Sequence, residues 1–336
     1  MDRLFPILLF IGVFAAALLA THIILRILRR RSVFDRPNER SSHTAPTPRG
    51  GGWALVIVLV PVWSYIGLTG TDNTTEISAL SGCALALALM SWHDDLNGMS
   101  PVWRLLGQAA AVALVLSVAP DHGLYFAGLL PRALDSFAAG LLWVWFINLF
   151  NFMDGIDGIS GIEAACIGAG VALVGFFADL HEPLPSYGLT MAAAALGFLW
   201  WNWRPAKVFL GDVGSVTLGF LLGWLLLALS AQGQWAAALI LPLYYLADAT
   251  VTLMRRALRG EKVWQAHREH FYQRAVQKGL KHSDVALIVL VADLALIVSA
   301  VTAAMGWIWP SLSGACIVVA MLFYFFGSAR FMIYQK

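Results

Sequence analysis

Long apolar runs separated by short polar segments follow one another along almost the whole chain. Most runs reach about 20 residues, the length of helix that crosses a bilayer core of about 30 Å. They lack a polar face, which indicates helices surrounded by lipid or protein. Backbone groups in lipid must satisfy their own hydrogen bonds, so we interpret the runs as transmembrane helices. The predicted spans are 4–25, 52–70, 76–92, 102–119, 133–150, 159–178, 187–203, 213–231, 235–254, 283–305 and 311–329.

Composition supports this interpretation. Of the 336 residues, 59% are hydrophobic and only 12% are charged, and the mean hydropathy is +0.73. These values exclude a soluble globular domain of this length. No repeat or low-complexity tract divides the chain. We expect one all-α membrane-embedded domain over 1–336, with about eleven transmembrane helices.

The distribution of Lys and Arg predicts the orientation. If the loop after the first span is cytoplasmic, 20 of the 22 Lys and Arg residues fall on the cytoplasmic side, and only Arg3 and Arg132 fall outside. Cytoplasmic loops of membrane proteins carry such an excess. The N-terminus is therefore predicted outside and the C-terminus, with Arg330 and Lys336, inside. The loop 255–282 is the longest inside loop, with eight Lys and Arg against two Glu.

Polar segments that are distant in sequence converge on this predicted cytoplasmic side. The loops assigned to the outside, such as TGTDNTT and DLHEPLPS, carry no comparable set of side chains. We therefore expect the functional site on the cytoplasmic face. The converging segments are SSHTAPTPRGGG (41–52), HDDLNGMS (93–100), NLFNFMDGIDG (148–158), NWRPAKVFLGDVGS (202–215) and WQAHREHFYQR (264–274).

Two of these segments carry carboxylates. Asp94 and Asp95 are adjacent, so they repel each other unless a cation is near. Such a pair suits a metal, or a base acting on a phosphate or hydroxyl, although a solvated loop that ends a helix would also contain it. In the second segment Asn148, Asn151, Asp154 and Asp157 recur every third residue. Their hard oxygen atoms suit Mg²⁺ completed by phosphates; a helix cap followed by a glycine-rich turn is the alternative.

The remaining segments carry further candidates. Asp212 lies between two glycines at the start of a span, where it is either a helix cap or a metal ligand. Asn202 and Lys207 precede it and could contact a nucleotide or phosphate. In the basic loop, Arg268 between His267 and His270 suits an anionic diphosphate. The other charges of that loop suit lipid headgroups, and the two histidines alone are a weak zinc signal.

Three features are harder to interpret. TPRGGG (47–52) is either a weak phosphate-binding loop or the turn leading into the second span, because it lacks the spacing of the known nucleotide-binding loops. Asp248 and Asp293 lie within spans and need partners. We expect Asp248 to be structural, with a place in the lining of the site as the alternative. Asp293 has no interpretation from sequence.

The motif order resembles a known superfamily. DDLNG, NxxNxxDGxDG, NxxPAKVFLGDxGS and a His/Arg-rich last inside loop occur in this order in the polyprenyl-phosphate N-acetylhexosamine-1-phosphate transferases. These include the bacterial phospho-MurNAc-pentapeptide translocase and the WecA-type and WbpL-type enzymes that begin O-antigen and related glycans. The likeness covers about residues 35–275. It implies ten or eleven transmembrane helices.

The resemblance also implies roles for individual residues. Asp94 and Asp95 match the paired catalytic aspartates, and Asp94 matches the base that acts on the lipid phosphate. Asp212 and Asn151 match metal ligands. Asp154 and Asn202 match positions that contact the uridine end of the donor, and Arg104 matches a phosphate contact. The positions that match contacts to the donor diphosphate and sugar are His267, Arg268 and His270. Asn148, Asp157 and Lys207 are expected to assist them in substrate binding.

Two departures favour a donor without a peptide. The last loop reads HREH where the peptidoglycan translocase has a run of histidines, and HTAPTPRGGG replaces its PTMGG-type segment. The resemblance therefore implies a UDP-N-acetylhexosamine donor, a polyprenyl (undecaprenyl) phosphate acceptor and Mg²⁺, with Mn²⁺ as an alternative. It implies a multi-pass protein of the bacterial inner membrane that contacts membrane lipid and no nucleic acid, with a homodimer left open. The sugar itself is not determined.

Two other classes of protein share some of these features. An aspartate-rich membrane prenyltransferase would use DDLN and DGID but would leave GDVGS unexplained. A secondary transporter usually binds its substrate near the bilayer midplane, whereas these carboxylates cluster at one interface. A direct transfer and a two-step transfer through a covalent aspartyl intermediate remain equally compatible with the sequence.

Overall fold

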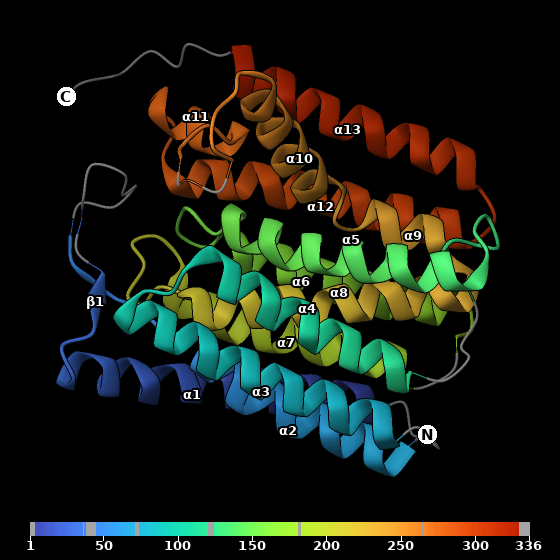
Figure 1. The fold of residues 1–336 in the computed structure, drawn as a ribbon, viewed down its shortest axis with the longest axis horizontal. Coiled ribbons are helices and arrows are strands. Elements are labelled where there is room, and N and C mark those ends of the chain that lie inside the picture. The colour runs from blue at the N-terminus through green and yellow to red at the C-terminus, as the bar shows by residue number, and fades with distance from the viewer. Residues whose placement is uncertain are drawn as a thin grey trace.

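The computed structural model describes residues 4–35, 37, 45–70, 74–119, 124–180, 183–263, 265 and 267–328. Arg3, the stretch 41–44, Trp264, Arg330 and Lys336, which entered the sequence predictions, lie outside the described residues. Nearly all of the described chain is helical, and a single two-stranded sheet accompanies the helices (Figure 1). The elements are α1 (Phe5–Arg30), β1 (Phe34–Asp35), β2 (Thr47–Pro48), α2 (Trp53–Gly70), α3 (Thr74–Asn97), α4 (Pro101–Val118), α5 (Arg132–Met153), α6 (Ile159–Phe177), α7 (Leu184–Asn202), α8 (Asp212–Leu229), η1 (Ser230–Gln234), α9 (Trp235–Ile240), α10 (Leu243–Leu258), α11 (Phe271–Gln277), α12 (His282–Ala304) and α13 (Ile308–Ser328).

The predicted all-α membrane fold is confirmed. Within the described residues, nine helical segments are long and apolar enough to cross a membrane. Eight of them follow single predicted spans, and the ninth, Asp212–Ile240, runs from the span predicted over 213–231 into the span predicted over 235–254. Helix α7 adds a further helix of 19 residues at the span predicted over 187–203. The total of eleven crossings and the direction of insertion stay predictions.

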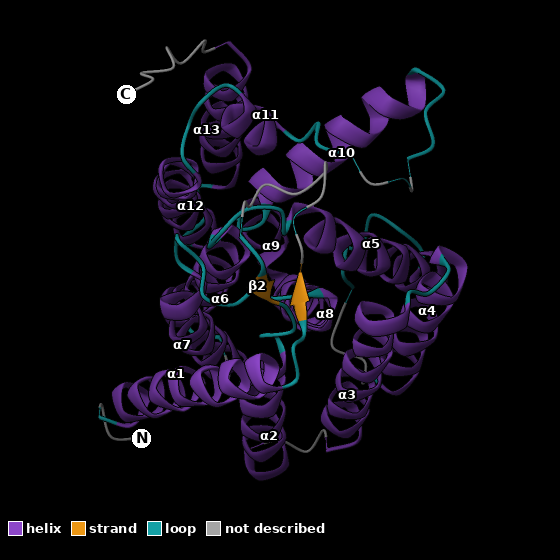
Figure 2. Ribbon diagram, turned by 90° about the vertical axis from the view of Figure 1, so that its left-hand side faces the viewer, coloured by secondary structure: helices purple, strands orange, loops and turns teal. Residues whose placement is uncertain are grey.

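One predicted span is wrong in its geometry. The run 235–254 is not one straight helix, because it breaks at Leu241 and Pro242 into α9 and α10. Proline has no N–H to donate to the preceding turn, and its ring clashes with the carbonyl four residues back. After this break α10 diverges from the other helices, as Figure 2 shows.

Helix α8 lies at the centre of the bundle. It packs against α3, α5 and α6, while α7 packs on α6 and α1 packs on α7. All of its residues from Val213 to Leu226 are buried, which explains why its sequence is apolar on every side. The indole of Trp143 on α5 stacks on Phe220 of α8 and donates a hydrogen bond of 2.8 Å to its carbonyl. The core therefore fixes the start of α8, where Asp212 lies.

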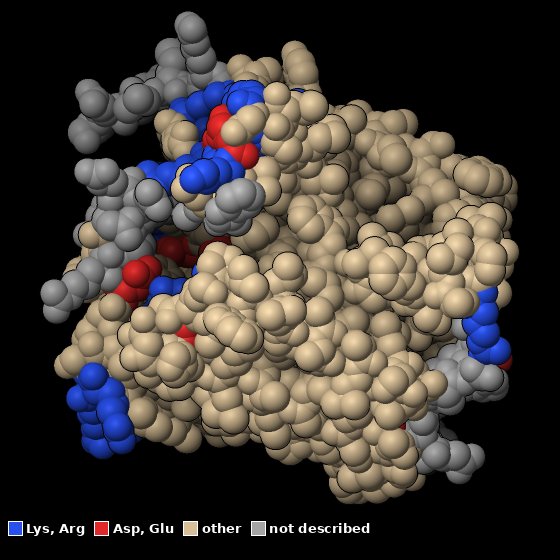
Figure 3. Space-filling view, in the orientation of Figure 1, with Lys and Arg blue, Asp and Glu red and all other residues tan. Residues whose placement is uncertain are grey.

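The loops that carry the polar segments lie together on the left of Figure 1, and Figure 2 looks onto that side. Strands β1 and β2 pair there, with Phe34 opposite Pro48, and Arg49 then bridges to Phe209 in the loop before α8. In Figure 3 the Lys, Arg, Asp and Glu side chains gather at this side, with acidic atoms inside a recess. The predicted convergence of the polar segments at one end of the bundle is therefore confirmed.

Candidate active site

The loop before α8 is held by the TPRGGG segment. The N–H groups of Gly51 and Gly52 donate to the carbonyl oxygens of Phe209 and Leu210 at 2.8 and 2.9 Å. A Cβ atom on Gly52 would lie 2.1 Å from the Cα of Gly214, so no larger residue fits there. This contact joins the start of α2 to the start of α8. The glycines of the segment thus hold the two helix starts together, and the arginine before them, Arg49, faces the site.

Asp95 caps helix α8 from the end of α3. Its two carboxylate oxygens accept hydrogen bonds of 3.3 Å from the backbone N–H groups of Asp212 and Val213. The first N–H groups of a helix have no partner within the helix, so a carboxylate there is stabilising. Arg49 Nη2 lies 2.6 Å from Asp95 Oδ1, and the Asp95 side chain is only 2% exposed. Asp95 is thus fully engaged in positioning α8.

Asp212 lies between two arginines. Its Oδ1 accepts a hydrogen bond of 2.8 Å from Arg49, and its Oδ2 lies 3.6 Å from Arg104. Arg104 in turn lies 3.1 Å from Asp94 Oδ2. Three carboxylates and two guanidinium groups therefore form one cluster at the meeting point of α3, α4 and α8. Burial alone would lower the pKa of Arg49, but the charges of the aspartates raise it above its ordinary value.

Asn151, near the end of α5, faces the first turn of α8. Its Nδ2 donates a hydrogen bond of 2.7 Å to Ser215 Oγ, and that hydroxyl donates to Gly211 O at 3.2 Å. Because the hydroxyl proton is already used, the amide must present its nitrogen to Ser215. The amide oxygen of Asn151 is then on the opposite side and is available as a ligand. Asn148 instead donates to Gln108 Oε1 at 2.6 Å and joins α5 to α4.

Asp154 directly follows α5 and is half-buried. Burial, followed by smaller effects that include the charges of Asp212 and Asp95, raises its pKa to about 7. A group that feels these charges belongs to the same electrostatic cluster. Arg104 therefore joins Asp94 to Asp212, and Asn151 bonds the first turn of α8, whereas the place of Asp154 beside them and the role of each residue stay predictions.

Asp157 and Asn202 hold two loops of the site together. Asp157 accepts a hydrogen bond of 3.1 Å from Ala206 N and lies 3.4 Å from His282 Nδ1. Burial opposes ionisation, but these partners keep the pKa of Asp157 below its ordinary value. The amide of Asn202 accepts from Gly158 N at 3.0 Å and donates to the Val208 carbonyl at 2.9 Å. Both side chains thus position the backbone.

Lys207 lies on the same pair of loops. Its ammonium group is 5.1 Å from the centre of the Trp201 ring, a cation–π contact, and the side chain is exposed. Direct substrate contacts by Lys207, Asp157 and Asn202 stay predictions.

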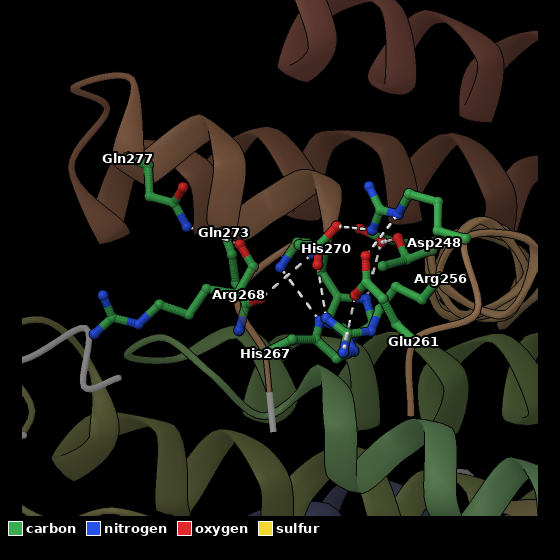
Figure 4. A network of polar contacts seen from close by, with 11 residues as sticks. Asp248, Arg256, Glu261, His267, Arg268, His270, Gln273 and Gln277 are labelled. Atoms are coloured by element: carbon green, nitrogen blue, oxygen red, sulfur yellow. Dashed lines mark hydrogen bonds and ion pairs between the residues drawn. The ribbon is translucent and has the colours of Figure 1, made fainter. Parts of the chain in front are cut away.

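The His/Arg segment forms a separate network, shown in Figure 4. Asp248 is fully buried and lies 3.1 Å from His270 Nδ1. It also accepts hydrogen bonds from two hydroxyls and two backbone N–H groups, which confirms its predicted structural role; these donors are Tyr244, Thr252, Phe271 and Tyr272. His267 packs on His270 with ring centroids 4.8 Å apart. Asp248, in the first half of α10, therefore holds His270, on which His267 packs.

The two arginines around that histidine pair point in different directions. Arg256 bonds Glu269 at 2.6 Å and Glu261 at 3.2 Å, which closes the loop after α10 onto itself. Arg268 extends away from this network (Figure 4), and its carbonyl accepts from Gln277 Nε2 at 2.7 Å. Burial, with smaller effects from His270 and Arg256, lowers the pKa of His267 to about 4. His267 is thus neutral at physiological pH, and Arg268 is a cation directed away from the histidine pair.

Arg49 is the site residue that sequence reasoning missed. From sequence, the TPRGGG motif indicates a weak phosphate-binding loop or a turn, and neither interpretation assigns a role to its arginine. The available signal was a lone arginine directly before three glycines on the predicted cytoplasmic side. Among the described residues, no three His, Cys, Asp or Glu side chains come close enough to hold a metal by themselves.

The fold and this site define a class: a polytopic helical membrane protein with a carboxylate–arginine cluster at one end of its bundle. A family model described as "Glycosyl transferase family 4" matches residues 77–230. Over these residues the chain is similar to that family.

Curated relatives extend the match. The chain is 26% identical over 311 residues to the probable undecaprenyl-phosphate N-acetylglucosaminyl 1-phosphate transferase of Bacillus subtilis, which covers 90% of this chain and 86% of the relative. It is 27% identical over 308 residues to the decaprenyl-phosphate N-acetylglucosaminephosphotransferase of Mycobacterium tuberculosis, covering 80% and 75%. It is 27% identical over 226 residues to the phospho-N-acetylmuramoyl-pentapeptide-transferase of Streptococcus pyogenes, which covers 62% of this chain and 66% of the relative. The resemblance to polyprenyl-phosphate N-acetylhexosamine-1-phosphate transferases is thus confirmed.

Proposed function

We propose that the protein transfers N-acetylhexosamine 1-phosphate from a UDP-sugar to polyprenyl phosphate, releasing UMP. The observation that carries this proposal is the cluster of Asp94, Asp95 and Asp212 with Arg49 and Arg104 at one end of an apolar bundle. Two phosphate-bearing substrates, one soluble and one lipid, can meet at such an end. The names of relatives that act on undecaprenyl and decaprenyl phosphate support the acceptor. The HREH and HTAPTPRGGG segments depart from those of the peptidoglycan translocase, which favours a donor without a peptide.

The side chains present fit a magnesium ion. Asp212 offers a carboxylate and Asn151 an amide oxygen set by its bond to Ser215, and both are hard oxygen ligands. Mg²⁺ normally keeps waters and substrate phosphates in its coordination shell, so two protein ligands are sufficient. When bound, the ion would neutralise the donor diphosphate and the charge that develops on the leaving UMP. Mn²⁺ would substitute for it.

Asp94 is proposed as the base. Its Oδ2 is buried and forms no hydrogen bond with any described residue, although Arg104 is 3.1 Å away. Asp94 would accept the last proton of the lipid phosphate. An oxygen of that phosphate then attacks the β-phosphorus of the donor, the bond to the UMP oxygen breaks, and UMP leaves. In the two-step alternative, an aspartate oxygen attacks first and the lipid phosphate attacks the resulting aspartyl phosphate.

Arg104 and Arg268 would bind phosphate groups, and Asp154 would contact the nucleoside end of the donor. His267, being neutral, would serve as a hydrogen-bonding group, and His270 would position it. We further propose that residues 1–336 act as one catalytic domain in the bacterial inner membrane, with this site and the loop 255–282 on the cytoplasmic side. The product would start a cell-surface glycan.

The rival classes find less support in the geometry. A prenyltransferase would need its two acidic motifs to face each other, but Asp157 of DGID is held by Ala206 and His282. A transporter site would lie in the middle of helices, whereas Asp94, Asp95 and Asp212 lie at the end of α3 and the start of α8.

The direct test replaces Asp212 by Asn. Membranes containing the protein are supplied with polyprenyl phosphate, Mg²⁺ and a panel of UDP-N-acetylsugars, and UMP release is measured. One donor should release UMP with the unaltered protein, and Asp212→Asn should reduce that release at least about a hundredfold, as loss of a transition-state charge partner does. Asp179→Asn, an exposed aspartate after α6, is the control and should be fully active. Near-normal turnover by Asp212→Asn would contradict the metal role.

A further inference from the structure

One nitrogen of Arg49 contacts two acids from two different helices. Its Nη2 lies 2.6 Å from Asp95 Oδ1 and 2.8 Å from Asp212 Oδ1. The Asp95 side chain is 2% exposed and that of Asp212 is 20% exposed. Without a cation between them, two carboxylates with so little exposure to water would repel each other. Arg49 supplies that cation.

Hydrogen bonds fix the backbone of Arg49, while its side chain reaches solvent. Arg49 N donates to Val33 O at 3.3 Å, and on either side Pro48 O accepts from Phe209 N and Gly51 N donates to Phe209 O, both at 2.8 Å. The Arg49 side chain is 34% exposed. The guanidinium can therefore swing towards solvent without any change in the loops that build the site.

A metal ion and Arg49 compete for the same oxygen. Mg²⁺ binds carboxylate oxygens at about 2.0–2.1 Å and orders its ligands in an octahedron. Arg49 already occupies the Oδ1 side of Asp212 at 2.8 Å, and Arg104 lies near the Oδ2 side at 3.6 Å. The shorter contact is the one that a metal on Oδ1 would displace. Asp95 loses less by this change, because two backbone N–H groups still bond it.

We propose that Arg49 is the internal counter-ion of the metal site: its guanidinium neutralises Asp212 in the metal-free protein and leaves Asp212 Oδ1 when the divalent cation binds. This role rests on the proposed function, since it takes Asp212 as a metal ligand. It makes Arg49 a positioning residue that sets metal affinity. The same contact keeps α3 and α8 together before the substrates arrive.

The test measures metal binding directly, with Mn²⁺ as the probe. Purified protein in detergent is titrated with Mn²⁺ and free Mn²⁺ is followed by electron paramagnetic resonance. Arg49→Gln should bind Mn²⁺ about five- to tenfold more tightly, the change that removal of one partly exposed ion pair supports. Arg49→Lys keeps the charge and should lie between Arg49→Gln and the unaltered protein. Arg29→Gln, an exposed arginine at the end of α1, is the matched control and should have unaltered affinity.

Thermal unfolding provides a second readout. In EDTA, Arg49→Gln should melt at a lower temperature than the unaltered protein, and Mg²⁺ should raise its melting temperature by more. Unchanged or weaker Mn²⁺ binding in Arg49→Gln would overturn the counter-ion role, as would a raised KM for the donor with unaltered metal affinity.

Asp212→Asn separates this inference from the proposed function. Loss of Mn²⁺ binding in Asp212→Asn together with unaltered binding in Arg49→Gln refutes only the counter-ion. Normal Mn²⁺ binding in Asp212→Asn refutes the metal site itself.

Discussion

Asp94, Asp95 and Asp212 have the same side chain and very different surroundings. Asp95 is bonded by two backbone N–H groups and by Arg49, so its carboxylate is part of the fold. Asp94 has Arg104 as its neighbour and a buried oxygen without a hydrogen bond from any described residue. Asp212 is the most exposed of the three at 20%. Position in the DDLNG and GDVGS motifs therefore separates a structural carboxylate from two that remain open to substrates.

This difference predicts opposite behaviour of neighbouring variants. Asp95→Asn should lower the free energy of unfolding by about 1–3 kcal/mol, because an amide cannot accept two N–H bonds and an arginine at once. Asp94→Asn should lower the free energy of unfolding by less, because Asp94 Oδ2 accepts no hydrogen bond from a described residue, while abolishing UMP release. Thermal unfolding in detergent, paired with the transferase assay, distinguishes them. Equal stability of the two variants would refute the capping role of Asp95.

His267 predicts a dependence of stability on pH. The unfolded chain binds a proton at His267 below about 6.5, whereas the folded protein does so only below about 4. The unfolded state thus binds more protons between these values, so the free energy of unfolding should fall as pH falls from about 6.5 to about 4. Solvent screening at a half-exposed side chain limits the effect to about 1 kcal/mol.

Melting temperatures measured from pH 7.5 to 4.5 test this expectation. His267→Gln should lose less stability than the unaltered protein over that range. His93→Gln, at an exposed histidine on α3, is the control and should follow the unaltered curve. An identical pH dependence in His267→Gln would show that another group is responsible.

At the scale of elements, a buried acid pair joins α6 to α12. Glu163 on α6 and Asp293 on α12 are 1% and 2% exposed, and these two helices pack against each other. No described residue donates a hydrogen bond to any of their four oxygens. A carboxyl group buried in an apolar bundle has lost the hydrogen bonds of water and needs a polar neighbour, so we infer that Glu163 and Asp293 are neighbours of this kind for each other. Asp293, uninterpreted from sequence, is therefore half of a contact between helices.

The pair should behave as a unit. Glu163→Met and Asp293→Leu should each lower the free energy of unfolding by about 1–3 kcal/mol, because each leaves one buried carboxyl group without a partner. The double variant should be more stable than either single variant, since it leaves no polar group behind. Thermal unfolding of the three variants in detergent gives the coupling energy. Additive losses would mean that the two carboxyl groups do not depend on each other.

The elements themselves were largely predictable from local pattern. The spans predicted over 159–178 and 213–231 correspond to α6 and α8 to within two residues, because apolar length is a property of the segment alone. The span 235–254 failed because Pro242 lies within a run that is otherwise apolar enough to continue. Hydrophobic length indicates that a segment enters the membrane, while a single proline decides whether it remains one helix.

At the scale of the whole molecule, alternation of loops predicted which polar segments meet. That reasoning needs no contacts, and it brought Asp94, Asn151, Asp154 and Asp212 to one end of the bundle. It could not predict which side chains at that end form hydrogen bonds and ion pairs with each other. Arg49 and Asp212 are separated by 163 positions, and nothing in either motif indicates which carboxylate a guanidinium selects. The same limit hid the Asn151–Ser215 bond, which sets the direction of a proposed ligand atom.

The orientation of the molecule in the membrane is the last prediction. The cluster must face the compartment that holds the UDP-sugar, and the excess of Lys and Arg at that end predicts the cytoplasm. A cysteine at Lys262, exposed in the loop after α10, should react with a membrane-impermeant maleimide only in inverted membrane vesicles. A cysteine at Leu129, which is 84% exposed between α4 and α5, should react in intact spheroplasts.

Both variants are made after Cys83, Cys166 and Cys316 are replaced by Ala, and each must retain transferase activity. Each cysteine is expected to react in only one of the two preparations, because Leu129 precedes α5 whereas Lys262 follows α10. Labelling of the Lys262 cysteine in intact spheroplasts would place the carboxylate cluster outside the cell. A cytoplasmic nucleotide sugar could not reach it there, and the proposed donor would be wrong even if the chemistry of the site were right.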